Sequence, residues 1–238
     1  DYFNSPILFD GKTKVTKHKY LTFQFTDEAV GFIEAAQKKP FFMYLAYNAV
    51  HGPNQAPEDY IAKFVHLPPG ERLQAAMVSA LDDGIGQVLD ALKRTGQEEN
   101  TLVYFLSDNG GLQSWWKGSN EPWRGFKREQ WEGGCHVQFI MRWPAEIPAG
   151  KERNEMVSSL DIFPTSLAAA GIKIPKHAQL DGANLLPVFT KPEKQVVHDY
   201  LFWAGSHVPA DKRFDELPYH HDDPPATWAV RHGKWKLV

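Results

Sequence analysis

Two short apolar runs, each followed directly by a polar turn, constrain the fold of this chain more than any other feature of its sequence. Residues 41–47 (FFMYLAY) and 101–106 (TLVYFL) are continuous apolar stretches of strand length, which is typical of strands buried on both faces of a sheet. Between them, apolar residues recur at helical spacing over residues 71–95, which predicts a long amphipathic helix. Strands that alternate with helices predict an α/β fold with a largely parallel sheet.

Weaker patterns predict the other elements of this layer. Thr26 precedes two acidic residues and is expected to cap a helix that runs from there to about Gln37. Gly84 and Gly86 inside the long helix cost about 1 kcal/mol each relative to alanine, so we expect close packing against another element there. Further elements are expected as a short helix through Tyr60 and Phe64, a strand over residues 137–143, and a helix over residues 161–170 that Gly171 ends.

The pattern changes after about Tyr200. Residues 200–203, 228–231 and 235–238 are short strand-like segments, and His232-Gly233 separates the last two, as in the turn of a hairpin. This pattern predicts a small antiparallel sheet. We therefore expect an α/β domain over residues 1–195 and a small antiparallel C-terminal subdomain over residues 196–238.

Composition excludes several classes of function. A hydrophobic fraction of 42% is enough for a packed core. The formal net charge of -3 gives no electrostatic reason to expect nucleic acid or an anionic membrane as partner. No apolar run approaches the roughly 18 to 20 residues needed to span a bilayer. The single cysteine, Cys135, cannot form an internal disulfide.

The turn after residues 101–106 is a candidate metal site. Asp108 and Asn109 offer a carboxylate and an amide oxygen side by side, and ligands of open α/β sheets bind at the carboxyl ends of strands. Hard cations such as calcium bind several oxygen ligands. Taken alone, however, the Asp-Asn-Gly sequence favours an ordinary Asx-type turn without a metal.

Two further segments carry candidate catalytic residues. His51 follows the first apolar run and could donate a proton to a leaving group near neutral pH, although a loop histidine bonded to backbone is the commoner case. Lys127 lies between glycines and beside arginines in the segment WRGFKRE, which suits a compact anion. A solvated basic loop is the alternative interpretation.

Aromatic and histidine clusters give weaker signals. Trp115, Trp116 and Trp123 lie close in sequence to Lys127 and could stack on sugar rings, but ordinary packing is the favoured interpretation. Residues 220–223 (HHDD) have metal-ligand side chains, yet prolines flank them, so an exposed loop is expected there.

In their order along the chain, these segments resemble the calcium-dependent sulfatases of the alkaline-phosphatase superfamily. The resemblance rests on residues 41–53 (FFMYLAYNAVHGP), 77–92 (MVSALDDGIGQVLDAL), 100–111 (NTLVYFLSDNGG), 123–134 (WRGFKREQWEGG), 157–170 (VSSLDIFPTSLAAA), 180–187 (LDGANLLP) and 229–238 (AVRHGKWKLV). It implies an alkaline-phosphatase-like α/β sandwich with a mainly parallel sheet, plus a small C-terminal antiparallel sheet.

The resemblance also implies roles for single residues. Asp108 and Asn109 match the metal-binding pair of the family, which holds Ca²⁺, with Mg²⁺ as the alternative ion. His51 matches the histidine assigned to protonation of the leaving group, and Lys127 matches the lysine that contacts the sulfate. The nucleophile of the family is a formylglycine, made from cysteine or serine, and its hydrated form attacks sulfur.

The sequence departs from the family pattern in ways that affect function. The family's nucleophile motif, Cys or Ser followed by x-Pro/Ala-x-Arg, is absent from these 238 residues, and Cys135 does not fit it. The N-terminal Asp-Asp pair of the metal site is absent as well. Val50 and Glu121 stand where proline and glycine are common. We therefore expect this chain to be the C-terminal portion of a longer enzyme, and to be inactive alone.

Three functions remain open at this point. The first is sulfate-ester hydrolysis by the intact protein, on sulfated carbohydrates or aryl sulfates, and the resemblance implies an exported enzyme. The second is a related phosphodiesterase or phosphonate hydrolase. Two-zinc members of that superfamily use aspartate and histidine ligands, whereas an asparagine follows Asp108 here, which favours one hard cation. The third is a non-catalytic fragment that binds sulfated glycans. An upstream nucleophile motif in the parent protein would separate the first function from the third.

Overall fold

The computed structural model describes residues 1–9, 11–16, 18–36, 39–112, 119–191, 196–205 and 227–238. These residues belong to two compact units. The first unit is built from residues 1–101, and the second from residues 102–113 and 119–238. No helix in the described ranges is long and apolar enough to cross a membrane.

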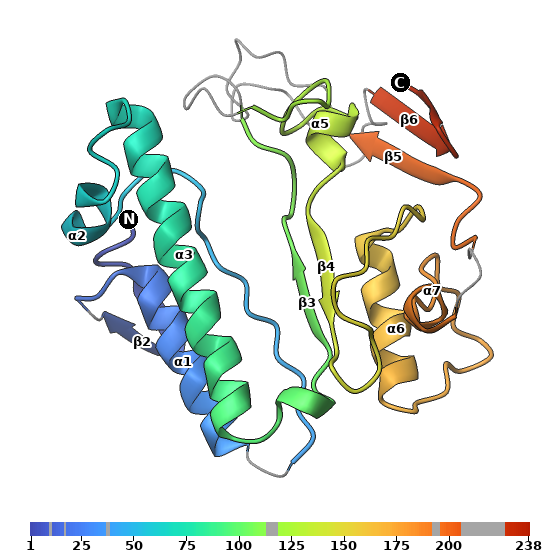
Figure 1. The fold of residues 1–238 in the computed structure, drawn as a ribbon, viewed down its shortest axis with the longest axis horizontal. Coiled ribbons are helices and arrows are strands. Elements are labelled where there is room, and N and C mark those ends of the chain that lie inside the picture. Colours follow the sequence, from blue (N-terminus) through green and yellow to red (C-terminus); the bar gives the residue numbers. More distant parts are fainter. Residues whose placement is uncertain (10, 17, 37–38, 113–118, 192–195, 206–226) are drawn as a thin grey trace. The chain divides into compact units, whose positions relative to one another are not determined.

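The first unit is built on two long helices that lie side by side (Figure 1). Helix α1 (Leu21–Ala35) packs along α3 (Pro69–Arg94), and the short α2 (Glu58–Ala62) also contacts α3. The strands β1 (Pro6–Phe9) and β2 (Thr13–Thr16) form an antiparallel hairpin, and a 3-10 turn, η1 (Glu98–Asn100), follows α3. The core of the first unit contains Tyr2, Tyr20, Leu21, Ala56, Ala76, Met77 and Ala80.

The long helix α3 confirms the predicted helix and explains one of its two glycines. Its buried face is lined by small residues, among them Ala76, Ala80 and Gly84. A Cβ atom at Gly84 would lie 2.6 Å from Oγ1 of Thr26 on α1, so a glycine is needed for this close approach. Nothing lies within 4 Å of a Cβ at Gly86, and the packing reason that we expected does not hold there.

The predicted start of α1 is wrong by about one and a half turns. The helix begins at Leu21, with Tyr20 as its N-cap residue, and Thr26 lies inside it. Thr26 Oγ1 donates a hydrogen bond to the Thr22 carbonyl at 2.9 Å and lies 2.8 Å from the Tyr47 hydroxyl. Because the Thr26 hydroxyl is satisfied in this way, it can be buried in mid-helix and is not needed as a cap.

Residues 41–47 are not a doubly buried strand in the described structure. They form no strand ladder with any described residue, and their exposure alternates along the chain. Phe41 packs edge-on against Phe32 of α1, with ring centroids 5.7 Å apart, whereas Phe42 and Tyr44 are 76% and 84% exposed. One face of this segment is therefore packed and the other is open.

The second unit is centred on a pair of strands, β3 (Val103–Leu106) and β4 (Phe139–Arg142), shown side by side in Figure 1. They pair antiparallel, with Val103 opposite Arg142 and Leu106 opposite Phe139. A parallel pair needs a crossover of a dozen or more residues, usually a helix. The described residues between β3 and β4 contain only the four-residue helix α5 (Glu132–Cys135), so the expected parallel pairing is not found in the described strands.

Helices and a small sheet complete the second unit. A 3-10 turn η2 (Ser159–Asp161) leads into α6 (Ile162–Ala169), which confirms the helix expected there, and α7 (Leu186–Thr190) follows. The strands β5 (Leu201–Gly205), β6 (Thr227–His232) and β7 (Trp235–Leu237) form an antiparallel sheet in that order, which confirms the predicted C-terminal sheet. This sheet belongs to the same compact unit as β3, and a division between residues 195 and 196 stays a prediction. The core of this unit contains Met141, Ile147, Leu185 and Val188.

A fully buried carboxylate joins three segments of the second unit. Oδ2 of Asp161 accepts a hydrogen bond from the Ser158 backbone nitrogen at 2.7 Å. Oδ1 accepts from the Ala183 backbone nitrogen at 2.7 Å and lies 2.8 Å from Nε2 of His198. Because every bond of this buried group is made within the unit, Asp161 holds the start of α6, the segment before α7 and the segment before β5 together.

Candidate functional site

The turn that carries Asp108 and Asn109 begins where β3 ends. Ser107 donates its backbone N–H to the Gln138 carbonyl at 3.3 Å, and its hydroxyl to the Asn109 carbonyl at 2.9 Å. Oδ1 of Asp108 accepts from the Asn109 backbone nitrogen at 2.9 Å. The turn is therefore fixed by local hydrogen bonds, and the exposed Asp108 carboxylate keeps Oδ2 for another partner.

The oxygen atoms of this turn fit a hard cation but are too few to bind one alone. Nδ2 of Asn109 donates to the Gly110 carbonyl at 3.2 Å, which leaves the amide oxygen as a possible ligand beside Oδ2 of Asp108. Calcium takes six to eight oxygen ligands. Within the described ranges, no group of three or more His, Cys, Asp and Glu side chains could hold a metal. Most ligands of a calcium ion would have to be other oxygens, including water.

Backbone hydrogen bonds tie this turn to the segment that carries Lys127. The Lys127 backbone nitrogen donates to the Gly111 carbonyl at 3.0 Å, and the Gly110 nitrogen donates to the Gly134 carbonyl at 3.0 Å. The side chain of Asn120 adds a bridge, because Oδ1 accepts from the Gly111 nitrogen at 3.0 Å. Its Nδ2 lies 3.1 and 3.0 Å from the carbonyl oxygens of Gly111 and Gly125.

Glycines allow these two segments to approach so closely. A Cβ atom at Gly110 would overlap the backbone carbonyl of Gly133, and one at Gly133 would overlap the carbonyl of Gly125. A Cβ at Gly134 would overlap the Glu129 carbonyl. Because each obstacle is backbone rather than a movable side chain, these positions require glycine. The Gly-Gly pairs in the sequence therefore mark the contact between the two segments.

The loop around Lys127 presents one lysine that has no acidic partner among the described residues. Gly125 and Arg128 adopt positive φ angles of 91° and 80°, which turn the chain sharply on either side of Lys127. The Arg124 guanidinium stacks over the Trp131 ring at 4.0 Å. No described carboxylate pairs with the half-buried Lys127, so its ammonium group could bind an anion.

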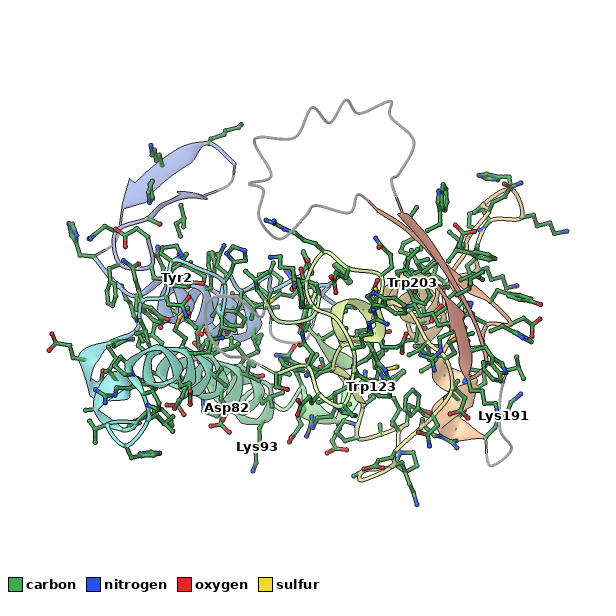
Figure 2. All side chains as sticks on the ribbon, turned by 90° about the horizontal axis from the view of Figure 1, so that it is seen from above. Tyr2, Asp82, Lys93, Trp123, Lys191 and Trp203 are labelled. Atoms are coloured by element: carbon green, nitrogen blue, oxygen red, sulfur yellow. The ribbon has the colours of Figure 1, made fainter. Side chains whose placement is uncertain are left out.

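The aromatic residues near this loop are partly described. Trp123 is 43% exposed and stacks on the His136 ring, with centroids 4.5 Å apart. Figure 2 labels its side chain on the loop. Trp115, Trp116 and residues 220–223 lie outside the described residues, so the sugar platform and the histidine cluster stay predictions.

His51 lies on the first unit, in a loop that Tyr2 fastens. The Tyr2 hydroxyl lies 2.6 and 2.9 Å from the carbonyl oxygens of Asn48 and His51. Burial raises the pKa of Tyr2 to about 12, so the hydroxyl stays protonated and can donate. Nδ1 of the exposed His51 lies 2.9 Å from the Gly52 carbonyl. A carbonyl only accepts, so Nδ1 carries the proton, and Nε2 is left for another partner.

The structure thus brings three of the four predicted site residues into one local assembly. Asp108, Asn109 and Lys127 belong to the second unit and are joined by the bonds through Gly110, Gly111 and Asn120. His51 belongs to the first unit, and its position relative to the other three stays a prediction. Sequence reasoning missed Asn120, which no local signal marks.

Comparisons with known proteins identify a family for this chain. The sulfatase family model matches residues 1–172, and the model for the C-terminal part of N-sulphoglucosamine sulphohydrolase matches residues 123–238. An uncharacterized sulfatase of Escherichia coli, YdeN, is 36% identical over 210 residues, which cover 87% of this chain and 37% of that protein. Mouse N-acetylgalactosamine-6-sulfatase is 36% identical over 176 residues, 72% of this chain and 33% of that protein.

A solved structure is similar over nearly the whole chain. Ps i-CgsB in complex with k-i-k-neocarrahexaose superimposes with a TM-score of 0.83 at 34% identity, covering 98% of this chain and 48% of that one. The chain spans about a third of the length of the curated relatives described above. The match of the family model to residues 1–172 shows that the chain belongs to the sulfatase family, which has the alkaline-phosphatase-like fold.

Proposed function

We propose that the full-length protein containing this chain hydrolyses sulfate esters, and that its substrates are sulfated carbohydrates. The observation that carries the proposal is the backbone junction between the Asp108-Asn109 turn and the Lys127 loop. These backbone hydrogen bonds join the turn to the loop, which supports a single site made of Asp108, Asn109 and Lys127. The names of two similar proteins, an N-acetylgalactosamine-6-sulfatase and a neocarrahexaose complex, support a carbohydrate substrate.

Each site residue has a distinct part in this proposal. Oδ2 of Asp108 and the amide oxygen of Asn109 would hold a calcium ion, which polarises the sulfate oxygens when bound. Lys127 would bind the sulfate and stabilise the negative charge that develops in the transition state. In its doubly protonated form, His51 would keep the Nδ1 proton on the Gly52 carbonyl and donate the proton of Nε2 to the departing sugar oxygen.

The nucleophile lies outside these 238 residues in this proposal. None of their cysteines or serines is followed by x-Pro/Ala-x-Arg. We infer that the full-length protein supplies a formylglycine from such a motif, and that it is exported. Loss of a nucleophile from a comparable hydrolytic site lowers turnover by about a millionfold, so the 238-residue chain should release no sulfate. If the parent carries no such motif, the glycan-binding function replaces the catalytic one.

The first test separates the roles of His51 and Lys127 in the full-length protein. Lys127→Ala should lower kcat/KM by roughly 100- to 1000-fold for every sulfate ester, because transition-state charge loses a partner. His51→Ala should lower it by roughly 100-fold or more for a sugar sulfate. The loss should be much smaller for an activated aryl sulfate, whose leaving group needs no proton.

Matched variants control for nonspecific effects in this assay. Lys93→Ala removes a lysine that is exposed on α3, where Figure 2 shows its side chain pointing away from the helix. His66→Ala removes another exposed histidine. Both should keep normal activity. Equal losses on the two substrates for His51→Ala would exclude the proton-donor role, and an unaffected Lys127→Ala would exclude sulfate binding by that lysine.

The second test concerns the metal. Chelation should abolish sulfate release by the full-length protein, and calcium should restore it. Asp108→Ala should raise the calcium concentration needed for half-maximal activity at least tenfold, because a carboxylate ligand is lost. The control is Asp82→Ala, which removes an exposed carboxylate on α3 (Figure 2). Activity that survives chelation, or an unchanged calcium requirement in Asp108→Ala, would contradict this assignment.

A further inference from the structure

Glu132 at the start of α5 is an acidic side chain that the proposed chemistry does not use. Its Oε2 accepts a hydrogen bond from Nη1 of Arg231 at 2.7 Å, and its Oε1 accepts from Nζ of Lys236 at 3.0 Å. Nδ1 of His136 lies 3.2 Å from Oε2. Arg231 is on β6 and Lys236 is on β7, so one carboxylate joins α5 to two strands of the C-terminal sheet.

This ion-pair network is more buried than an ordinary surface salt bridge. The side chains of Glu132 and Lys236 are 20% and 9% exposed, and the Lys236 ammonium lies 3.9 Å from the centre of the Trp203 ring. Burial alone would raise the pKa of Glu132, but Lys236, Arg231 and His136 outweigh it and hold the pKa below its ordinary value. The carboxylate is therefore ionised at neutral pH.

The two residues after Glu132 hold the candidate site together. The Gly133 nitrogen donates to the Arg124 carbonyl at 2.7 Å, and the Gly134 carbonyl accepts from the Gly110 nitrogen at 3.0 Å. Among the described residues, the hydrogen bonds and ion pairs of Glu132 do not include Asp108, Asn109 or Lys127. A shift of α5 would nevertheless move both the Asp108-Asn109 turn and the Lys127 loop, because α5 is bonded to each.

We propose that Glu132 is a positioning residue that fixes the candidate site to the C-terminal sheet. Its ion pairs with Arg231 and Lys236 hold α5 in place. The backbone hydrogen bonds of Gly133 and Gly134 then connect α5 to the loop and the turn. The effect of Glu132 on catalysis rests on the proposed sulfatase function, whereas its effect on the geometry of the site does not. A misplacement of about 1 Å can cost roughly 100-fold in rate.

Hydrogen exchange tests the geometric part without any assay of activity. In the full-length protein, Glu132→Gln should speed exchange at the amides of Gly110, Lys127 and Gly133 by at least tenfold. Lys236→Met removes the β7 partner of Glu132 and leaves the sequence of α5 unchanged. It should speed exchange at the same three amides. The control is Asp161→Asn, which removes a buried carboxylate of the same unit that makes no bond to residues 107–134.

Kinetics then test the effect on catalysis. At equal loss of thermal stability, Glu132→Gln should lower kcat at least tenfold and raise the calcium requirement, whereas Asp161→Asn should change neither. Lys236→Arg keeps the charge and should retain most of the rate that Lys236→Met loses. Unchanged exchange at the three amides in both Glu132→Gln and Lys236→Met would overturn the proposal. So would an Asp161→Asn variant that exchanges as fast as Glu132→Gln. If the wild-type protein shows no sulfatase activity but both variants still exchange faster than it does, the positioning role stands and the proposed function is removed.

Discussion

Single residues in this chain differ sharply in how much room their surroundings leave. Gly84 and Gly86 lie half a helical turn apart on α3, yet only Gly84 faces α1 at close range. The buried carboxylate of Asp161 bonds to its own capping turn at Ser158 and to two other segments at Ala183 and His198. These surroundings lead to one prediction for the two glycines and one for Asp161.

Alanine should have opposite effects at the two glycines of α3. Gly84→Ala should destabilise the protein by about 1–3 kcal/mol, because its methyl group would overlap Thr26. Gly86→Ala should stabilise it by up to about 1 kcal/mol, through helix propensity alone. Chemical denaturation measures both, and Gly84→Ala should cost less in a Thr26→Ala background. Equal effects at the two positions would mean that the close approach of α1 and α3 is wrong.

Asp161→Asn should destabilise the protein although it changes little in size. An asparagine can accept hydrogen bonds with its oxygen, but its amide nitrogen would face either the Ser158 or the Ala183 backbone N–H. One buried donor is then left without an acceptor, at a cost of about 1–3 kcal/mol. A melting temperature within a degree of wild type would show that the Asp161 bonds contribute no net stability.

At the scale of elements, the site depends on contacts between short segments rather than on long helices or strands. Gly110→Ala should disrupt the junction between the Asp108-Asn109 turn and α5, because its methyl group would overlap a backbone carbonyl. Gly86→Ala on α3 is the control, since nothing lies within 4 Å of its methyl group. Activity of the full-length protein should fall at least tenfold in the first variant and little in the second. Similar activities in both would argue against the junction.

The ion pairs between α5 and the C-terminal sheet should be sensitive to acid. The pKa of Glu132 is lowered in the folded protein, so its stabilising contribution is fully present above the ordinary glutamate pKa. It is lost as the pH falls through the lowered folded value. The difference in free energy of unfolding between wild type and Glu132→Gln should therefore be largest near neutral pH and shrink in acid. A difference that stays constant from pH 7 to pH 3 would contradict this.

Sequence reasoning found the elements whose pattern is local. The helical spacing of apolar residues in α3 and the strand–turn–strand pattern around His232-Gly233 can be read from neighbouring residues alone. Contacts between distant residues could not be read in this way: Thr26 is buried because Tyr47 reaches it, and the antiparallel pairing of β3 with β4 depends on residues far apart in the chain. For the site, the candidate residues could be named from the motif, whereas Asn120 and Glu132 act through partners that no local pattern reveals.

At the scale of the whole molecule, several large apolar side chains are open to solvent. Those more than half exposed include Phe42, Tyr44, Ile140, Phe202, Trp228, Trp235 and Leu237. Exposed apolar side chains favour association. The purified 238-residue chain should therefore form oligomers or aggregates whose mass rises with concentration in light scattering. A stable monomer across concentrations would contradict the prediction.

The Asn120 amide has a consequence for how such a chain can diversify. By bonding to Gly111 and Gly125, it holds the chain at residue 120 against the chain at residue 111. We expect changes of length or sequence between these two points to leave Asp108 and Lys127 in place. Under the proposed function, the preference for a sugar could then change while the residues proposed to bind the sulfate stay the same.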